Sequence, residues 1–451
     1  MDRATNSKGN SLTVSVIGLG KLGSCYAAFC AGRSLNVIGT DSDSRKVEAL
    51  NGGTAPVEET DLQTYIKKNR DRLRAVHGTQ EAIRNSSATF IIVPTPSQKN
   101  GSFSLAPATA VCTDIGNALK EKKGYHLVTL VSTVLPEDCR SHLIPAIENA
   151  SGKRCGVDFG FCYSPSLIAI GDVLKNLENP DFLFLGAFDK KSEDTLAHIY
   201  SQLYPSVAPE RMSIESAELA KIALNSFVTT KITFANTLGM LCEKIPHANV
   251  DQITTALGKD KRIGSHYIKS GLGFGGPCFP RDNAAFAQMA SRRGVTTPLA
   301  LATHEFNKSL PKHIAGIIDT FAKQHEARRV GFLGVSYKPR TTLTEDSQAL
   351  FIAEEIVRLG YKIAIFEPLG SNEASMQFGK KALYPESLED LVVWVDVIFI
   401  SNRDERFREI PSLLKRSGAK KVIIDPWGMF QNKDFNPGVI YHALGRSNPS
   451  R

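Results

Sequence analysis

The stretch Leu12-Thr-Val-Ser-Val-Ile-Gly-Leu-Gly-Lys-Leu-Gly23 decides the fold of this 451-residue chain. Six residues with a strand-like pattern run directly into three glycines spaced G-x-G-x-x-G, and a helix of small residues is predicted over 24–32. A second strand is predicted over 35–40 and ends at Asp41. This order of strand, glycine turn, helix and strand with an acidic end predicts the first unit of a parallel α/β sheet.

The glycine turn predicts a dinucleotide site. Glycines there permit a tight turn and let a pyrophosphate approach the N-terminus of the following helix. Asp41 would accept from the ribose 2′-hydroxyl of NAD and repel the 2′-phosphate of NADP. Because of Arg45 and Lys46, NADP stays an alternative cofactor. The other interpretation of these two residues is a solvated helix face. We expect NAD as the cofactor, with Gly18, Gly20, Gly23, Asp41 and Arg45 among its binding residues.

Two further predicted strands, over 88–93 and 126–130, end in hydroxyl-bearing residues. Thr95 follows the first strand and Thr133 follows the second. Ligands of open α/β sheets gather at the carboxyl ends of strands, so both threonines are expected to line the cofactor site. The alternative is that they cap the next helices.

The rest of the chain predicts a second sheet after a helical region. A long helical pattern covers 215–245, and another covers 298–309. Strand and helix patterns alternate again after residue 325. The predicted fold class is therefore α/β, with two Rossmann-like parallel-sheet domains joined by a central helical region. The expected parts are a disordered N-terminus at 1–11, an NAD-binding domain at 12–205, a central dimerisation region at 206–324 and a C-terminal substrate-binding domain at 325–445.

Composition excludes several other classes of function. The net charge of +8 is spread thinly, so nucleic acid is not an expected partner. The longest apolar run, Leu391–Ile400, is broken by Asp396 and is too short to cross a membrane. No secretory signal is visible, which favours a cytoplasmic protein. The eight cysteines lack C-x-x-C pairs and histidines at zinc spacing, so no metal site is expected.

A glycine-rich segment, 264–283, delivers one cysteine to the start of a predicted helix over 281–291. Cys278 precedes Pro280, and proline is tolerated in the first turn of a helix. The helix dipole would favour the thiolate form of Cys278, which is the nucleophilic form. A buried structural cysteine is the alternative for such a residue considered alone.

The long central helix carries a second set of polar residues. Lys221 and Asn225 are four positions apart and share one face. Glu218 lies three positions before Lys221, and a surface Glu–Lys pair is the simplest interpretation of that spacing.

Taken together, these motifs resemble those of the nucleotide-sugar 6-dehydrogenases, the family of UDP-glucose dehydrogenase and the UDP-N-acetylhexosamine dehydrogenases. The resemblance extends from about residue 12 to residue 430. The matching motifs are Gly18-x-Gly20-x-x-Gly23, Ser132-Thr133, Glu218-x-x-Lys221-x-x-x-Asn225, Gly258-x-Asp260-x-Arg262-Ile-Gly264, Gly273-Phe-Gly-Gly-Pro-Cys278-Phe-Pro-Arg-Asp282 and Tyr337-Lys338-Pro339.

The resemblance implies oxidation of the C6 alcohol of a UDP-sugar to a carboxylate in two NAD-dependent steps. Cys278 would form a thiohemiacetal and then a thioester with the substrate. Lys221 and Asn225 would stabilise the developing oxyanions, while Thr133 and Asp282 would hold and activate water. Arg262 resembles an arginine that reaches the sugar from a neighbouring subunit, which implies a homodimer or larger oligomer. The residues expected to line the substrate site are Lys221, Asn225, Arg262, Lys269, Gly275, Phe279, Tyr337 and Lys338.

The chain also departs from the family pattern. A glutamate linked to thioester hydrolysis is replaced by Ser166, and a later glutamate by Ile170. The family signature Arg-Glu-Ser is Glu345-Asp346-Ser347 here, and an expected arginine falls within 425–428. Three alternatives stay open: a dehydrogenase of UDP-glucose, one of a UDP-N-acetylhexosamine, and a nucleotide-sugar-binding protein that has lost hydrolysis. A two-domain β-hydroxyacid dehydrogenase has neither the Cys278 segment nor the second sheet.

Overall fold

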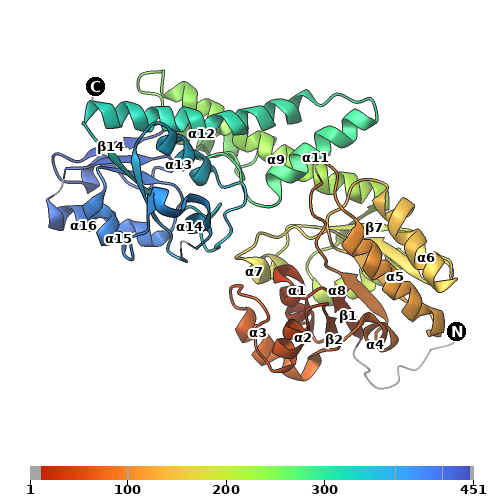
Figure 1. Cartoon of the computed structure of the whole chain (residues 1–451). Helices are drawn as coiled ribbons and strands as arrows, with labels where there is room; N and C mark the ends of the chain where they lie inside the picture. The colour runs from red at the N-terminus through yellow and green to blue at the C-terminus, as the bar shows by residue number, and fades with distance from the viewer. Residues whose placement is uncertain (1–11, 99–100, 371, 419, 447–451) are drawn as a thin grey trace. The chain divides into compact units, whose positions relative to one another are not determined.

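A computed structural model describes residues 12–98, 101–370, 372–418 and 420–446 (Figure 1). The N-terminal segment 1–11, for which we expected disorder, lies outside these residues. The chain divides into two compact units, Met1–Ile222 and Ala223–Arg451. The division falls within helix α9, Ile214–Cys242, which is continuous over 29 residues.

The first unit is built on an eight-stranded sheet in the order β3-β2-β1-β4-β5-β6-β7-β8. Strands β1 to β6 are parallel, whereas β7 pairs with β6 in the antiparallel direction and β8 is parallel to β7. The helices α5 and α6 lie side by side (Figure 1). The strands are β1 Thr13–Ile17, β2 Asn36–Thr40, β3 Leu73–Ala75, β4 Ala88–Ile91, β5 Leu127–Leu130, β6 Gly160–Tyr163, β7 Leu183–Ala187 and β8 Pro209–Ser213; the helices are α1 Lys21–Gly32, α2 Ser44–Asn51, α3 Leu62–Lys68, α4 Thr79–Arg84, α5 Ala106–Glu121, α6 Ile144–Ser151, α7 Val173–Glu178 and α8 Lys190–Leu203.

The second unit contains a six-stranded parallel sheet in the order β11-β10-β9-β12-β13-β14. Helices α9 to α12 come before this sheet in the chain, and α12 packs against α13 (Figure 1). The strands are β9 Arg329–Leu333, β10 Lys362–Phe366, β11 Ala382–Leu383, β12 Val397–Ile400, β13 Val422–Asp425 and β14 Ile440–Ala443; the helices are α10 Val250–Lys259, α11 Phe279–Arg292, α12 Pro298–Gln324, α13 Gln348–Arg358, α14 Asn372–Phe378, α15 Leu388–Trp394 and α16 Ile410–Ser417.

The fold class predicted from the sequence is confirmed, with two parallel sheets and a helical region between them in the chain. One helix is longer than expected. The pattern predicted a helix over 298–309, but α12 continues to Gln324 with Pro311 in its interior. Pro311 is buried together with Leu310 and Ile314, so packing of this face outweighs the backbone hydrogen bond that the proline removes.

No helix among the described residues is both long enough and apolar enough to cross a membrane.

Candidate active site

The glycine turn of the first unit is tied to the end of β2. The amide of Gly18 donates to the carbonyl of Thr40 at 2.8 Å, and the amide of Leu19 donates to Asp41 Oδ2 at 2.6 Å. Lys46 Nζ lies 3.2 Å from the same carboxylate oxygen. Asp41 is therefore held at the carboxyl edge of the sheet beside the glycine turn, where the sequence predicts the ribose of NAD.

The three glycines of the motif have different structural roles. Gly18 has a positive φ of 98°, and a Cβ built on Gly23 would lie 1.8 Å from the Gly18 carbonyl oxygen. Both positions therefore require glycine for the packing of the turn against α1. Gly20 differs, because no atom of the described residues lies within 4 Å of a Cβ built there. Its lack of a side chain leaves open space at the N-terminus of α1, which fits the close approach of a pyrophosphate.

Arg45, expected in the cofactor site, has a side chain that is 86% exposed. Its guanidinium donates to Asp43, the residue that caps α2, and the nearest charged atoms are 2.8 Å apart. That pairing raises the pKa of Arg45 and lowers the pKa of the Asp43 carboxyl. The structure thus gives Arg45 a helix-capping partner, and its contact with a cofactor stays a prediction.

The loops after β4 and β5 are joined to each other. Thr95 Oγ1 donates to the Thr133 carbonyl at 2.7 Å. Ser132 Oγ donates to the Val93 carbonyl at 2.6 Å and accepts from the Val93 amide at 2.9 Å. The structure therefore brings the two predicted threonines together at the carboxyl edge of the first sheet.

Lys221 is buried on α9, and its Nζ donates to the carbonyl oxygen of Ser166 at 3.0 Å. Ser166 follows β6, in the loop where the family pattern places its glutamate. The acceptor at this point is a main-chain carbonyl, so Lys221 is tied to this loop through the backbone of the loop.

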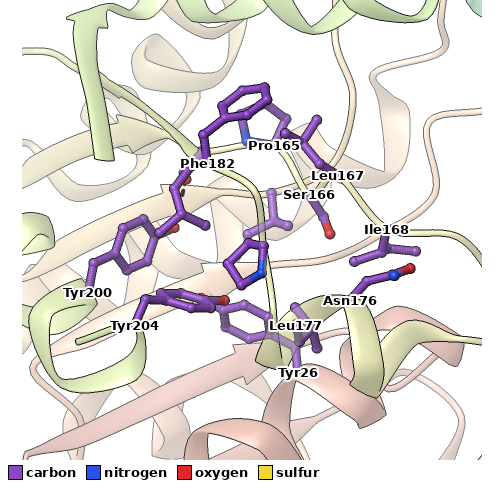
Figure 2. A pocket seen from close by; sticks show the side chains of 14 residues that line it. Tyr26, Pro165, Ser166, Leu167, Ile168, Asn176, Leu177, Phe182, Tyr200 and Tyr204 are labelled. Atoms are coloured by element: carbon purple, nitrogen blue, oxygen red, sulfur yellow. Dashed lines mark hydrogen bonds between the residues drawn. The ribbon is translucent and has the colours of Figure 1, made fainter. Parts of the chain in front are cut away.

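A pocket lies beside this loop, and apolar and aromatic side chains line most of it. Figure 2 shows Phe182, Tyr200 and Tyr204 around one side of the pocket, and Ile168 and Asn176 around the other. Ser164, Ser166 and Asn176 are the lining residues whose side chains are neither apolar nor aromatic. The replacement of glutamate by serine is thus accompanied by apolar surroundings that would disfavour a charged carboxylate.

Cys278 occupies the N-cap position of α11, as predicted, with Pro280 in the first turn. It is exposed, whereas the other seven cysteines are buried. One turn further along the helix, Asp282 is fully buried and accepts from Asn225 Nδ2 at 2.7 Å. Arg281 Nε lies 2.9 Å from the other Asp282 oxygen. The cysteine, the carboxylate and the amide therefore belong to one hydrogen-bonded corner between α9 and α11.

The glycines before Cys278 are required by packing partners far away in the sequence. A Cβ on Gly271 would lie 2.2 Å from the Trp427 ring, and one on Gly275 would lie 2.4 Å from the Asp346 carbonyl oxygen. Gly276 has a φ of 80° and contacts the ring of Tyr337. The loops of the second sheet therefore fix the path of the cysteine segment.

The remaining predicted substrate residues lie in two places within the second unit. Tyr337 packs on Gly276, and Lys338 follows it in the loop after β9. Phe279 makes an edge-to-face contact with Tyr267, with 6.0 Å between ring centroids. Lys269 is exposed.

Arg262 points elsewhere, since its side chain is 87% exposed and pairs with Asp260 at 2.6 Å. The structure therefore does not place this arginine in the corner formed by Cys278, Asn225 and Asp282.

Glu218 does not form the surface pair with Lys221 that the spacing suggested. It is fully buried, and its two carboxylate oxygens accept from the amides of Glu137 at 2.7 Å and Cys139 at 2.9 Å. The neighbours of Glu218 along the helix, including Ala217 and Ile222, are buried too, and this apolar setting was the available signal.

A second carboxylate, Glu367, escaped the sequence analysis. It follows β10 and accepts from the amides of Val335 at 2.7 Å and Ser336 at 2.9 Å. Its position directly after the second strand of the second alternation matches that of Asp41 in the first and could have been recognised.

No group of three or more His, Cys, Asp or Glu side chains within the described ranges could hold a metal ion.

Comparison with known protein families covers nearly the whole chain. The NAD-binding domain of the UDP-glucose/GDP-mannose dehydrogenase family matches residues 12–204, its central domain 215–309 and its UDP-binding domain 331–432. This chain belongs to that family. It is an NAD-dependent oxidoreductase of the nucleotide-sugar 6-dehydrogenase class.

Individual relatives agree with the family assignment. The chain is 31% identical to the GDP-mannose 6-dehydrogenase of Pseudomonas putida, over 94% of this chain and 97% of that protein. It is also 31% identical to a UDP-glucose 6-dehydrogenase of Haloferax volcanii, over 96% of this chain and all of that protein. The solved UDP-glucose dehydrogenase of Pyrobaculum islandicum superposes with a TM-score of 0.87 at 27% identity, covering 99% of this chain and 100% of that one.

Proposed function

We propose that this family member oxidises the C6 alcohol of UDP-glucose to the carboxylate, with NAD as the electron acceptor and Cys278 as the nucleophile. The observation that carries the proposal is the exposed cysteine at the N-cap of α11, one turn from the buried Asp282–Asn225 hydrogen bond. A thiol at a helix N-terminus is favoured in its thiolate form, and covalent capture of an aldehyde needs a thiolate.

The site fits a dinucleotide at the first sheet, through the open space at Gly20 and the carboxylate of Asp41. NAD bound there would supply the hydride acceptor for both oxidations of the substrate. Lys221, with Asn225 on the same helix, donates to the C6 oxygen as negative charge develops on it. The Cys278 thiolate adds to the aldehyde carbon, and the aldehyde oxygen takes up a proton to give the thiohemiacetal. The thiohemiacetal then loses a hydride from carbon and the proton from oxygen, which leaves a thioester. Water breaks the carbon–sulfur bond, which releases the carboxylate and restores the thiol.

Thioester hydrolysis is the step that Ser166 puts in question, because a serine does not act as a carboxylate base near neutral pH. We assign water binding to Thr133 and Asp282 in its place. The first oxidation should therefore be faster than the release of the acid. Thr133→Ala should slow acid release without slowing the first hydride transfer.

The sugar and its nucleotide are the finer part of the proposal. The match of residues 331–432 to a UDP-binding domain favours UDP. Relatives that carry the names GDP-mannose 6-dehydrogenase and UDP-glucose 6-dehydrogenase are equally similar at 31%, so GDP-mannose is the second candidate. UDP-N-acetylhexosamines remain the alternative within UDP-sugars.

The test is NADH formation by the purified protein with UDP-glucose, GDP-mannose and two UDP-N-acetylhexosamines, counted per sugar consumed. Two NADH per UDP-glucose, with loss of turnover in Cys278→Ser, is the expected result. One NADH per sugar would mean that the second oxidation is lost. Turnover of GDP-mannose alone would overturn the choice of UDP-glucose, and binding of a sugar nucleotide without turnover would make the chain a binding protein.

We propose that a second copy of this chain covers the outer face of α9. Phe227, Phe234 and Leu241 are spaced seven residues apart on this helix and are 65%, 52% and 52% exposed. Large apolar side chains at heptad spacing are typical of helices that pair. Arg262 would then reach the sugar site of the partner copy. Light scattering should give a dimer or larger oligomer, and Phe234→Glu should shift it towards the monomer.

We keep the predicted organisation into an NAD-binding domain at 12–205, a central dimerisation region at 206–324 and a UDP-sugar-binding domain at 325–445.

A further inference from the structure

The buried carboxylate of Glu218 has no role in the chemistry described above. It lies on α9 one turn before Lys221, and no part of it is exposed. Oε2 accepts from the Glu137 amide at 2.7 Å, and Oε1 accepts from the Cys139 amide at 2.9 Å. Both oxygens are thus used to hold the segment after the Thr133 loop. A buried carboxylate must keep its hydrogen-bond donors to offset the cost of burial, so these two main-chain contacts connect α9 firmly to the segment.

The connected segment is under conformational constraint. Glu137 has a φ of 80°, a conformation that residues other than glycine rarely adopt. Asp138 Oδ2 accepts from the Leu135 amide at 2.8 Å, and the π-helical turn Cys139–Leu143 begins directly afterwards. The amides of Glu137 and Cys139 point to Glu218 only while this conformation is kept.

The same short part of α9 carries Lys221, whose Nζ donates to the Ser166 carbonyl. Two hydrogen-bonded anchors therefore lie within one turn of the helix. Glu218 fixes the helix to the loop after β5, and Lys221 fixes it to the loop after β6. Since Thr133 is in the first of these loops, the position of Lys221 relative to Thr133 depends on the Glu218 contacts.

We propose that Glu218 is a positioning residue that fixes the position of Lys221 relative to Thr133, and that it does so only as the ionised carboxylate. The role rests on the function proposed above. A protonated carboxyl group, or an amide, turns a hydrogen towards one of the two main-chain amides and loses that hydrogen bond. The position of Lys221 relative to Thr133 should then be less fixed, although the residues that contact the substrate are unchanged.

The pH at which Glu218 gains or loses its proton is set mainly by burial. Burial raises the pKa of Glu218 to about 7, against the opposing effect of its hydrogen bonds. The charged and titratable groups around it are Asp138, Cys139 and Arg140 on the facing segment and Glu215 and Lys221 on its own helix. Asp138 raises the pKa of Glu218 further, and the pKa of the Cys139 thiol lies well above its usual value, so Cys139 stays neutral.

The test compares wild type, Glu218→Gln and Glu215→Gln between pH 5.5 and 8.5. Glu215 is a matched control, because it lies one turn away on α9 and pairs with Arg140 of the same segment through its side chain alone. Single-turnover NADH formation from UDP-glucose should be about tenfold slower in Glu218→Gln than in wild type at pH 8, the effect of losing one hydrogen bond. The two proteins should differ by less than about twofold at pH 5.5. Glu215→Gln should follow wild type throughout.

A second measurement separates this inference from the proposed function. Hydrogen exchange of the peptide 134–143 should be faster in Glu218→Gln than in wild type at pH 8 and equal to it at pH 5.5, with or without substrate turnover. Equal exchange at both pH values would overturn the inference even if UDP-glucose is oxidised. If no sugar is oxidised while the exchange difference appears, the proposed function fails and the positioning role of Glu218 stands. A constant rate deficit at every pH would reduce Glu218 to a structural residue and overturn its proposed dependence on charge.

Discussion

The two parallel sheets begin in the same way and are used differently. In the first, the Gly18 amide donates to the end of β2 and Asp41 accepts from the next residue of the turn. In the second, the Gly334 amide donates to the Phe366 carbonyl at 2.9 Å, and Glu367 accepts from the next two amides. The same main-chain connection is thus repeated, with an acidic residue at the same strand end.

The two sheets differ in the segment after this turn. In the first sheet α1 begins at Lys21, so its N-terminus lies at the open space beside Gly20. In the second sheet the loop continues until α13 begins at Gln348. That loop carries Tyr337 and Lys338 and packs on the glycines before Cys278. One strand arrangement therefore supports a glycine turn at a helix N-terminus in the first sheet and the base of the cysteine segment in the second.

The largest expected effect comes from removing the carboxylate of the second sheet. Glu367→Ala leaves the amides of Val335 and Ser336 without their acceptor, and Glu367 is only 7% exposed. The second unit should lose about 3 kcal/mol of unfolding free energy. Because both tryptophans, Trp394 and Trp427, belong to this unit, tryptophan fluorescence in denaturant reports its unfolding.

Glu389→Ala, which removes an exposed carboxylate of the same sheet domain, is the control and should change stability by less than about 0.5 kcal/mol. An unchanged denaturation midpoint in Glu367→Ala would contradict a structural role for Glu367 in this loop. Its carboxylate would then serve a ligand instead.

The second effect concerns acid. His126, directly before β5 in the first unit, is fully buried with Nε2 2.7 Å from Thr89 Oγ1, and burial lowers its pKa to about 3. A lowered histidine pKa means that its stabilising contribution is present above the usual value of about 6.5 and is lost as pH falls from there towards 3. Burial instead raises the pKa of Asp425 in the second sheet. The unfavourable contribution of this buried carboxylate to the free energy of folding therefore decreases as pH falls.

The first unit should therefore lose about 2 kcal/mol between pH 7 and pH 5 through His126. Hydrogen exchange of β4 and β5 measures the stability of this unit. The difference between wild type and His126→Gln isolates the His126 contribution from that of Glu218, whose pKa of about 7 acts in the opposite direction within the same unit. His77→Gln, at an exposed position of the same unit, should leave the His126 contribution intact. If His126→Gln lost as much stability in acid as wild type, other groups of the first unit would be responsible for the loss.

The smallest effect should come from Gly20→Ala. Its new methyl group would enter open space, so the unfolding free energy of the protein without cofactor should change by less than about 1 kcal/mol. The affinity for NAD should fall about tenfold, because the methyl group occupies the path of the pyrophosphate. Calorimetric titration with NAD measures this, and Gly316→Ala, which also faces open space but lies on α12, is the control. Unchanged affinity would show that the cofactor does not approach at Gly20.

The structural features that sequence analysis predicted correctly share a local signal. The turn from Gly18 to Gly23, the strand end at Asp41 and the helix start at Cys278 are encoded in consecutive residues, so short-range rules recover them. Glu218 was misread because its partners, Glu137 and Cys139, are some 80 positions away and use main-chain amides, which leave no trace in side-chain patterns. The extent of α12 was missed since Pro311 resembles a helix end unless its burial is known.

The glycines before Cys278 teach the same lesson. Gly271 is required by Trp427, more than 150 positions later in the chain, and no local sequence pattern reveals that partner. Packing partners so distant in sequence become visible only in the folded structure.

The distribution of exposed and buried thiols allows native and unfolded molecules to be distinguished by alkylation. One cysteine of eight is exposed, and burial raises the pKa of thiols such as Cys25, Cys30 and Cys112. An alkylating reagent should add a single mass increment to the native chain and eight to the unfolded one. Intact-mass spectrometry after a brief pulse would then count native and unfolded molecules in one spectrum, and protection of the single native increment by a bound sugar nucleotide would mark occupancy at Cys278.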